Sequence, residues 1–208
     1  MKKIIVIKIG SSVLLTKRHK LDEFRITHLA EEIHTLQKTG FGVVLVISGA
    51  VAYGSNFVDL SENHQHLRQA AAGIGQIHVI ATLNNIFNKW NLNLAQMLMT
   101  QNLFDSSLDK EKVKTLLEFY IHSNIIPVIN ENDVIDLNSF GGNDFLAAEI
   151  AKLLNTKKVV MLSTMKGSIH SVGGGLAKQQ AIQMLARNNI ETNIVNGKTK
   201  NILSTLML

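Results

Sequence analysis

The fold is decided by the stretch Ile4-Ile5-Val6-Ile7-Lys8-Ile9-Gly10-Ser11-Ser12-Val13-Leu14. The residues before the glycine are β-branched except for one lysine, which predicts a strand buried on both faces of a sheet. Lys8 is costly to bury near the end of such a strand unless it meets an anion. Gly10 lets a ligand approach the backbone closely, and Ser11 and Ser12 add small hydrogen-bond donors. This combination suits phosphate. The alternative is that Lys8 extends to solvent from an edge strand.

The composition indicates a globular chain with a sizeable core. The chain has 208 residues, of which 46% are hydrophobic, so we expect one domain or two small ones. It has no cysteine, which excludes disulfides and thiolate-bound metals and fits a reducing compartment. A net charge of +5 suits small anionic substrates, but no basic block is interleaved with aromatics, so we expect no nucleic acid partner. No apolar run reaches membrane-spanning length and no signal segment is visible, so we expect no membrane partner.

Strand and helix patterns alternate along the rest of the chain. Repeated strand–loop–helix units predict an α/β fold with a mostly parallel sheet and helices on both faces. Further strands are expected at 41–47, 92–99, 125–129, 157–163 and 191–196, and helices at 22–38, 63–90, 109–123, 145–154 and 176–187, with a helical tail at 197–208. Gly73 and Gly75 predict a break or a close helix crossing within 63–90. Asn143 or Asp144 is the expected N-cap of the helix at 145–154.

Polar and glycine-rich turns follow several of these strands. They are Ser48-Gly49-Ala50, Asn130-Glu131-Asn132-Asp133, Gly141-Gly142-Asn143-Asp144, and Gly173-Gly174-Gly175 with Lys178 shortly after. Ligands of parallel α/β sheets bind at the carboxyl ends of the strands, so these turns are predicted to form one site that handles phosphate. The alternative for residues 130–136 is a solvated loop. Serine hydrolase and metalloprotease chemistry have no support, because neither the G-x-S-x-G elbow nor a paired-histidine helix is present, and we expect no metal-ligating residues.

Four motifs occur together in an order typical of one family. They are Lys8 to Leu14, Ser48-Gly49-Ala50, Gln96-Met97-Leu98-Met99-Thr100, and Pro127 to Asp133. From Lys3 to about Lys178 the chain resembles the glutamate 5-kinases of the amino-acid kinase family. The resemblance implies a three-layer α/β/α sandwich, and it implies that the protein works in the cytoplasm. It also implies transfer of the γ-phosphoryl group of ATP to the side-chain carboxylate of L-glutamate, giving L-glutamyl 5-phosphate in the first step of proline biosynthesis.

The resemblance also implies how the chain is organised and what it binds. We expect a single kinase domain over residues 1–208, with a glutamate-binding part at about 1–150 and a nucleotide-binding part at 151–208. The family often carries a C-terminal domain of the RNA-binding type, and this chain ends before one. The expected ligands are L-glutamate, ATP and Mg²⁺ held mainly by the nucleotide, with proline as a candidate feedback inhibitor. The chain is expected to form a homo-oligomer.

The resemblance assigns roles to individual residues. Lys8 and Lys178 would hold the transferring phosphoryl group, and Asp144 would orient both lysines. The glutamate-binding residues would be Ser48, Gly49, Ala50, Asn130, Asp133 and Asn143. The nucleotide-binding residues would be Lys8, Gly10, Ser11, Ser163, Thr164, Gly173, Gly174, Gly175 and Lys178.

Three features depart from the family pattern. The family usually has aspartate where Gly142 and Thr164 stand, and it has several dozen residues where only five separate Gly167 from Gly173. The nucleotide-binding part therefore looks shortened. Two alternatives to an active glutamate kinase follow. One is a ligand-binding or regulatory protein on the same fold with little turnover. The other is a kinase of the family that acts on another small carboxylate or phosphate.

Overall fold

A computed structural model describes residues 2–61, 64–164 and 175–207 of the chain. Its centre is a six-stranded parallel sheet with the order β3-β4-β2-β1-β5-β6. The strands are β1 (Lys3–Ile9), β2 (Phe41–Ile47), β3 (Asn93–Met99), β4 (Ile125–Glu131), β5 (Lys158–Ser163) and β6 (Glu191–Asn196). The expected parallel sheet is confirmed, and the strand bounds lie within two residues of those expected.

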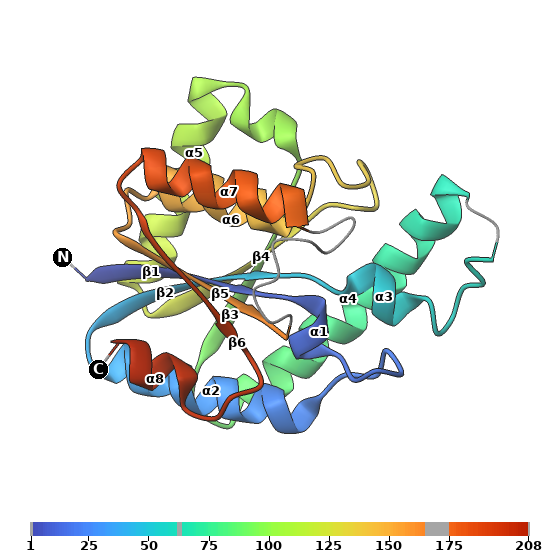
Figure 1. Ribbon diagram of the computed structural model, residues 1–208, viewed down its shortest axis with the longest axis horizontal. Coiled ribbons are helices and arrows are strands. Elements are labelled where there is room, and N and C mark those ends of the chain that lie inside the picture. Colours follow the sequence, from blue (N-terminus) through green and yellow to red (C-terminus); the bar gives the residue numbers. More distant parts are fainter. Residues whose placement is uncertain (1, 62–63, 165–174, 208) are drawn as a thin grey trace.

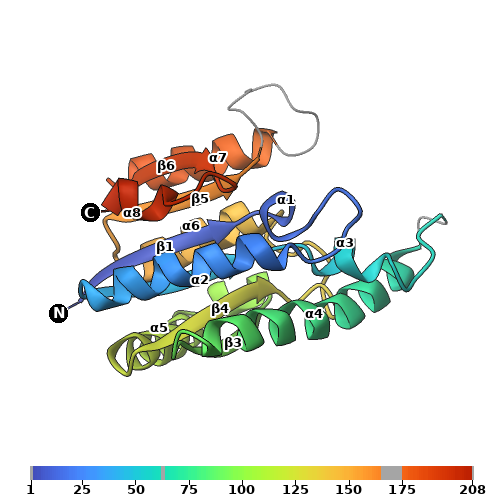
Figure 2. The ribbon, with the colours of Figure 1, turned by 90° about the horizontal axis from the view of Figure 1, so that it is seen from below.

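Helices cover both faces of the sheet and make three layers. They are α1 (Ser11–Leu14), α2 (Glu23–Lys38), α3 (Ala50–Gly54), α4 (Gln65–Asn88), α5 (Ser107–His122), α6 (Asn143–Leu153), α7 (Gly175–Arg187) and α8 (Ile202–Met207), with a 3₁₀ turn η1 (Gln101–Phe104). Helices α5, α6 and α7 lie on one face of the sheet, while α2 and α8 lie on the other (Figure 1). Figure 2 shows α4 running beside α2 on that second face. The expected α/β/α sandwich is therefore confirmed.

The alternation of side chains along β1 fills both core layers. Ile5, Ile7 and Ile9 are fully buried in the cluster that contains α2, α4 and α8. Val6 is fully buried in the opposite cluster, with residues of α5, α6 and α7. Successive side chains of a strand point to opposite faces, so Lys8 lies on the same face as Val6. Helices α6 and α7 pack on this same face of the sheet, near the end of β1 that holds Lys8.

Lys8 lies in the middle of the sheet, not at its edge. It is paired in register with Val46 of β2 on one side and with Met161 of β5 on the other. The alternative that Lys8 extends to solvent from an edge strand is therefore wrong. The turn that follows β1 is also more regular than expected, because Ser11 to Leu14 form one helical turn, α1, with Gly10 as its N-cap.

Gly73 and Gly75 predicted either a break in this helix or a close helix crossing, and helix α4 shows only the crossing. It is continuous from Gln65 to Asn88, so the break expected near Gly73 and Gly75 is absent. The close helix crossing is present, because a Cβ on Gly75 would lie 1.9 Å from the carbonyl oxygen of Ala50 in α3. A Cβ on Gly54 of α3 would likewise lie 1.9 Å from the carbonyl oxygen of Ala71 in α4. Glycine here allows two helices to touch backbone to backbone, which does not require a kink.

The start of α6 also differs from expectation. Gly142 is the N-cap, with φ 124° and ψ 155°, and Asn143 and Asp144 are the first two residues of the helix. This backbone conformation is open almost only to glycine. The consequence is that both polar side chains project from the first helical turn into the space above the sheet.

No helix within the described ranges is long and apolar enough to cross a membrane.

Candidate active site

A cleft of about 850 Å³ opens at the carboxyl ends of the strands. It lies between the ends of β1 and β2, the start of α4, the loop after β4 and the starts of α6 and α7. Its lining includes Lys8, Ser11, Ser48, Gly49, Ala50, Arg68, Glu131, Asp133, Gly142, Asn143, Asp144 and Ala177. Turns that are far apart in the sequence thus meet in one cavity. The alternative that residues 130–136 form only a solvated loop is wrong, because part of this segment forms a wall of the cleft.

Asp144 holds two lysines at the inner end of the cleft. Its Oδ1 lies 2.8 Å from Nζ of Lys8, and its Oδ2 lies 2.9 Å from Nζ of Lys178. The three side chains are largely buried, with exposed fractions of 13% for Asp144, 11% for Lys8 and 21% for Lys178. The three groups come from α6, β1 and the first turn of α7, so the layered fold itself brings them together. One carboxylate between two ammonium groups leaves a net positive charge at this end of the cleft.

Burial and charge act against each other in this cluster. Burial lowers the pKa of Lys8, Asp144 opposes that effect, and the neighbouring ammonium of Lys178 lowers the pKa again. Burial alone would raise the pKa of Asp144, but the two lysines outweigh it and hold that pKa below its usual range. Asp144 is therefore ionised at neutral pH. A bound anion would replace part of the lost hydration of both lysines.

The turn between β2 and α3 forms another wall. Ser48 donates its hydroxyl hydrogen to the carbonyl oxygen of Ile9 at 3.3 Å, which ties the ends of β1 and β2 together. Gly49 has φ 112°, which favours glycine, and it is the N-cap of α3, whose first residue is Ala50. The turn therefore presents a small hydroxyl and unobstructed backbone to the cleft.

The segment after β4 places its polar side chains in different directions. Asp133 lines the cleft, and its Oδ1 accepts a hydrogen bond from the backbone N–H of Asn138 at 2.9 Å. Burial raises the pKa of Asp133, with this hydrogen bond and the Arg68 guanidinium opposing the shift. Asn130 is buried and donates from Nδ2 to Oε1 of Gln76 at 2.8 Å, so it is directed to α4 rather than to the cleft lining.

Asn143 joins the same wall from α6. It lines the cleft, and its Oδ1 accepts a hydrogen bond from the backbone N–H of Glu131 at 3.4 Å. The structure thus brings Asp133, Asn143 and Ser48 to the cleft with Lys8 and Asp144. Asn130 is the one expected glutamate-binding residue that lies outside the cleft lining in the part of the chain described.

Two residues of the cleft were missed by the sequence reasoning. Glu131 is only 3% exposed, and its Oε2 accepts a hydrogen bond from the backbone N–H of Phe140 at 3.1 Å. The available signal was its position as a carboxylate at the end of a buried strand. Arg68 is exposed near the start of α4, and no sequence signal distinguishes it from an ordinary surface arginine.

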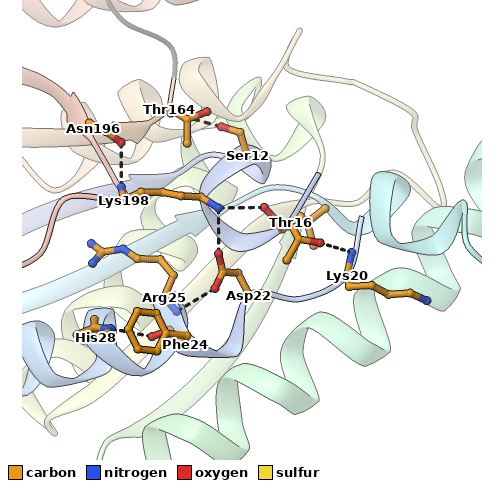
Figure 3. Close-up of polar contacts among 11 residues, drawn as sticks. Ser12, Thr16, Lys20, Asp22, Phe24, Arg25, His28, Thr164, Asn196 and Lys198 are labelled. Carbon is orange, nitrogen blue, oxygen red and sulfur yellow. Dashed lines mark hydrogen bonds and ion pairs between the residues drawn. The ribbon is translucent and has the colours of Figure 1, made fainter. Parts of the chain in front are cut away.

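A second cavity of about 470 Å³ lies beside the cleft and shares Ser11 and Ala52 with it. It is also lined by Ser12, Thr16, Lys17, His19, Thr164 and Lys198. Figure 3 shows Lys198 reaching Asp22, at 2.9 Å between Nζ and Oδ2, and the backbone N–H of Thr164 directed to Oγ of Ser12 at 3.4 Å. The ends of β1 and β5 are thereby joined at this corner.

The residues expected at the nucleotide are placed around this corner. The backbone N–H of Gly10 donates to the carbonyl oxygen of Leu162 at 3.0 Å, and Ser163 ends β5 as a largely buried residue. Gly175 is the first residue of α7. Gly173 and Gly174, and the shortening expected between Gly167 and Gly173, lie outside the described residues.

Within the described ranges, no group of three or more histidine, aspartate or glutamate side chains is placed to hold a metal ion. Of the three carboxylates that line the cleft in these ranges, those of Glu131, Asp133 and Asp144, the last is engaged by two lysines.

Comparison with known proteins gives one family and several relatives. The model of the family described as "Amino acid kinase family" matches residues 3–167. A glutamate 5-kinase of Lactococcus lactis subsp. lactis (strain IL1403) is 29% identical over 235 residues, covering 93% of this chain and 87% of that protein. A glutamate 5-kinase of Aquifex aeolicus (strain VF5) is 34% identical over 169 residues, covering 78% of this chain and 48% of that protein.

Solved structures share the fold at low sequence identity. UMP kinase from Ureaplasma parvum has a TM-score of 0.68 and 18% identity, with 99% of this chain and 95% of that chain covered. The isopentenyl phosphate kinase of T. acidophilum has a TM-score of 0.70 and 12% identity, with 98% and 95% covered. The alignment with the Lactococcus protein spans 235 positions, more than the 208 residues of this chain, so that relative has residues without a counterpart here.

Proposed function

This chain belongs to the amino acid kinase family, and from that premise we propose that it transfers the γ-phosphoryl group of ATP to the side-chain carboxylate of L-glutamate. The observation that carries the proposal is the pair of lysines on Asp144, both within 2.9 Å of its carboxylate at the inner end of the cleft. Phosphoryl transfer asks the protein mainly for positioning and for stabilisation of negative charge. Two fixed ammonium groups supply that charge.

Lys8 and Lys178 hold the oxygens of the transferring phosphoryl group, and Asp144 holds both lysines in place beside the cleft. Asp144 acts through the lysines, so it is a positioning residue. In the transfer step, an oxygen of the glutamate side chain forms a bond to the γ-phosphorus, and the bond from that phosphorus to the bridging oxygen of ADP breaks. The product is an acyl phosphate, L-glutamyl 5-phosphate. A carboxylate is already ionised at neutral pH, so the reaction needs no general base.

The opposite part of the cleft binds the amino acid. Asp133 pairs with the α-ammonium group of glutamate, because a partly buried carboxylate in the cleft is stabilised by a cationic partner. Ser48, Asn143 and the backbone at Gly49 and Ala50 provide hydrogen bonds to the substrate. Asn130 contributes indirectly, since its side chain is held by Gln76.

ATP binds across the ends of β1 and β5. The proposed nucleotide contacts are Gly10, Ser11, Ser163, Thr164, Gly173, Gly174 and Gly175, the last of which is the first residue of α7. Mg²⁺ accompanies ATP and is held mainly by its phosphate oxygens and by water. The donor set fits this arrangement, because Asp144 is occupied by two lysines and leaves no carboxylate cage in the described part of the chain.

The same proposal includes the division of the domain, the pathway, the oligomeric state and the regulation of the enzyme. The glutamate-binding part is residues 1–150 and the nucleotide-binding part is residues 151–208. The reaction is the first step of proline biosynthesis in the cytoplasm, and the enzyme is a homo-oligomer that proline can inhibit. The similarity to glutamate 5-kinases at 27–35% identity supports the reaction.

One observation favours a second candidate, a ligand-binding protein of the same fold with little turnover. The family usually has aspartate at the position of Gly142, and Gly142 here has φ 124° in the wall of the cleft. An acid that could help to bind the substrate amine is therefore replaced by a residue in a glycine-only conformation.

A coupled assay of ADP release separates the two candidates. The purified chain is incubated with ATP, Mg²⁺ and either L-glutamate, L-aspartate, a nucleoside monophosphate or no acceptor. ADP release that depends on L-glutamate supports the proposal. Release only with another acceptor contradicts the choice of substrate, and binding of glutamate without ADP release supports the second candidate.

A further inference from the structure

Glu131 connects the end of β4 to the far end of the loop that follows it. We call residues 132–142 the substrate loop, because they lead from β4 to Asn143 and Asp144. The Glu131 carboxylate accepts the backbone N–H of Phe140 at 3.1 Å, bridging nine residues, and the backbone N–H of Gly142 also stabilises its charge. The loop is thus closed on itself by a side chain at its base.

The substrate loop needs such a hold. Three of its residues have positive φ, which are Asn138 at 58°, Gly141 at 75° and Gly142 at 124°. Asparagine tolerates the left-handed conformation, and glycine adopts positive φ at a cost in chain entropy, so contacts around the loop must fix its two glycines. Phe140 is anchored in the core against Phe104, with ring centroids 5.3 Å apart, and its N–H is the one held by Glu131.

Burial of Glu131 is costly, and a neutral residue would be cheaper at this position. Its side chain is 3% exposed and lies at the cleft, yet it forms no ion pair within 4 Å among the described residues. A buried carboxylate without a paired cation destabilises a fold, and such groups are concentrated at functional sites. The location of Glu131, between the substrate loop and the cleft, indicates which function it serves.

We propose that Glu131 is a positioning residue for substrate binding: its carboxylate fixes the end of the substrate loop and thereby places Asp133 and Asn143 against the amino acid. The inference rests on the proposed phosphorylation of glutamate. Loss of the carboxylate loosens the loop and raises KM for glutamate. It leaves the two lysines on Asp144 in place, so kcat changes much less.

The charges around Glu131 make this hold dependent on pH. Burial raises its pKa to about 7, the N–H groups of Phe140 and Gly142 oppose the shift, and the carboxylates of Asp133 and Asp136 add to it. Lys8 on β1 also interacts electrostatically with Glu131. The ionised form accepts the loop N–H groups more strongly. KM for glutamate therefore rises as the pH falls through about 7.

The test measures KM for glutamate and kcat between about pH 6 and pH 9 in four proteins. Glu131→Gln keeps an acceptor for the N–H of Phe140 and removes the charge. Glu131→Asp keeps the charge and shortens the reach by one methylene group. Asp136→Asn is the matched control, because it removes one charge from the exposed side of the same loop.

The expected results distinguish fixation of the substrate loop by the Glu131 carboxylate from the effect of removing any negative charge nearby. At pH 8, Glu131→Gln and Glu131→Asp raise KM for glutamate about tenfold, the scale of one charged hydrogen bond, with kcat within about threefold of the parent. The parent shows a rise of KM below pH 7 that Glu131→Gln lacks. Asp136→Asn keeps the parent KM at pH 8 and moves the rise to lower pH. Glu131→Gln also melts no earlier than the parent at pH 8, because it removes a buried charge.

Three results would overturn the inference. They are a Glu131→Gln enzyme with the parent KM and pH profile, an Asp136→Asn enzyme that reproduces the Glu131→Gln defect, and a Glu131→Gln defect confined to kcat. If Glu131→Gln fails to fold, the inference is tested by the pH dependence of KM in the parent and in Asp136→Asn. It is overturned if the parent KM does not rise below pH 7 or if Asp136→Asn does not move that rise to lower pH. A parent without glutamate turnover overturns the proposed function and this inference together, whereas an active parent with an unchanged variant overturns this inference alone.

Discussion

Substitution of Asp144 by asparagine tests how the two lysines are held. The side chain keeps its shape but loses the charge that faces Lys8 at 2.8 Å and Lys178 at 2.9 Å. Each contact corresponds to an attraction of roughly 6 kcal/mol at an effective dielectric constant of about 20, much of it offset by the cost of burying the charges. Removing one partner of a buried ion pair typically costs about 3–5 kcal/mol of unfolding free energy. We expect the lower part of that range, because burial already lowers the pKa of Lys8 and this lysine can lose its proton.

The loss of Asp144 also changes the titration of Lys8. Burial and Lys178 already lower the pKa of Lys8, and Asp144 is the main group that opposes them. In Asp144→Asn that pKa therefore falls further. Since Lys8 must be protonated to stabilise the phosphoryl oxygens, kcat should drop about a hundredfold and should decline with rising pH at a lower pH than in the parent.

Urea denaturation and a pH–kcat profile measure these two effects. The matched control is Glu149→Gln, which removes an ion pair on the same helix, between Glu149 and Lys152 at 3.0 Å. This pair is partly exposed, so its loss should cost less than about 1 kcal/mol and leave kcat unchanged. An Asp144→Asn enzyme with parental stability, kcat and pH profile would refute the view that Asp144 positions the lysines.

Three further predictions concern the same cleft. Lys8→Ala and Lys178→Ala should each lower kcat about a hundredfold with little effect on KM for glutamate, and their combination should fall short of the product, because both act on one phosphoryl group; steady-state kinetics within a few-fold of the parent would refute this. Asp133→Asn should weaken glutamate binding by about 2 kcal/mol in calorimetry and leave ATP affinity unchanged, and the reverse pattern would show the assignment to be wrong. Gly142→Ala should lower the unfolding free energy by at least about 1 kcal/mol, because φ at this position is 124°; a variant as stable as the parent would contradict the backbone argument.

Restoring the acid that the family usually has at Gly142 is consequently not a simple repair. A Cβ on Gly142 meets no atom within 4 Å, so space is not the obstacle. The obstacle is the backbone, because any L-residue is strained at this φ and ψ. An aspartate here requires a different path for the end of the substrate loop.

The sequence predicts the sheet for local physical reasons, whereas the grouping of Lys8, Lys178 and Asp144 was implied by the resemblance to the family. The β-branched run before Gly10 identifies a buried strand, and its alternation of side chains fixes the face on which Lys8 stands. Asp144 and Lys178 lie in the first turns of two helices that follow glycine-rich segments, which parallel α/β topology brings to one edge. These features depend on patterns within a few residues of each other.

The features that the sequence did not reveal depend on contacts between distant segments. Asn130 and Glu131 are adjacent, yet Asn130 is bound by Gln76 of α4 while Glu131 turns back to Phe140. Gly73 and Gly75 predicted the close crossing of α4 with α3, but they did not show that α4 runs through both glycines without a break. Arg68 lines the cleft only because α4 begins beside it. Periodicity places a residue on a face but does not identify the partner it meets there.

The most direct test of the proposed reaction is to trap its product. Hydroxylamine converts an acyl phosphate to a hydroxamate, so the protein is incubated with ATP, Mg²⁺, L-glutamate and hydroxylamine, and the mixture is analysed by mass spectrometry. We predict glutamate γ-hydroxamate in an amount equal to the ADP released, and its near absence in Lys8→Ala and Lys178→Ala. Glutamate-independent ADP release, or hydroxamate formation that persists when both lysines are removed, would contradict transfer of the phosphoryl group between these two lysines.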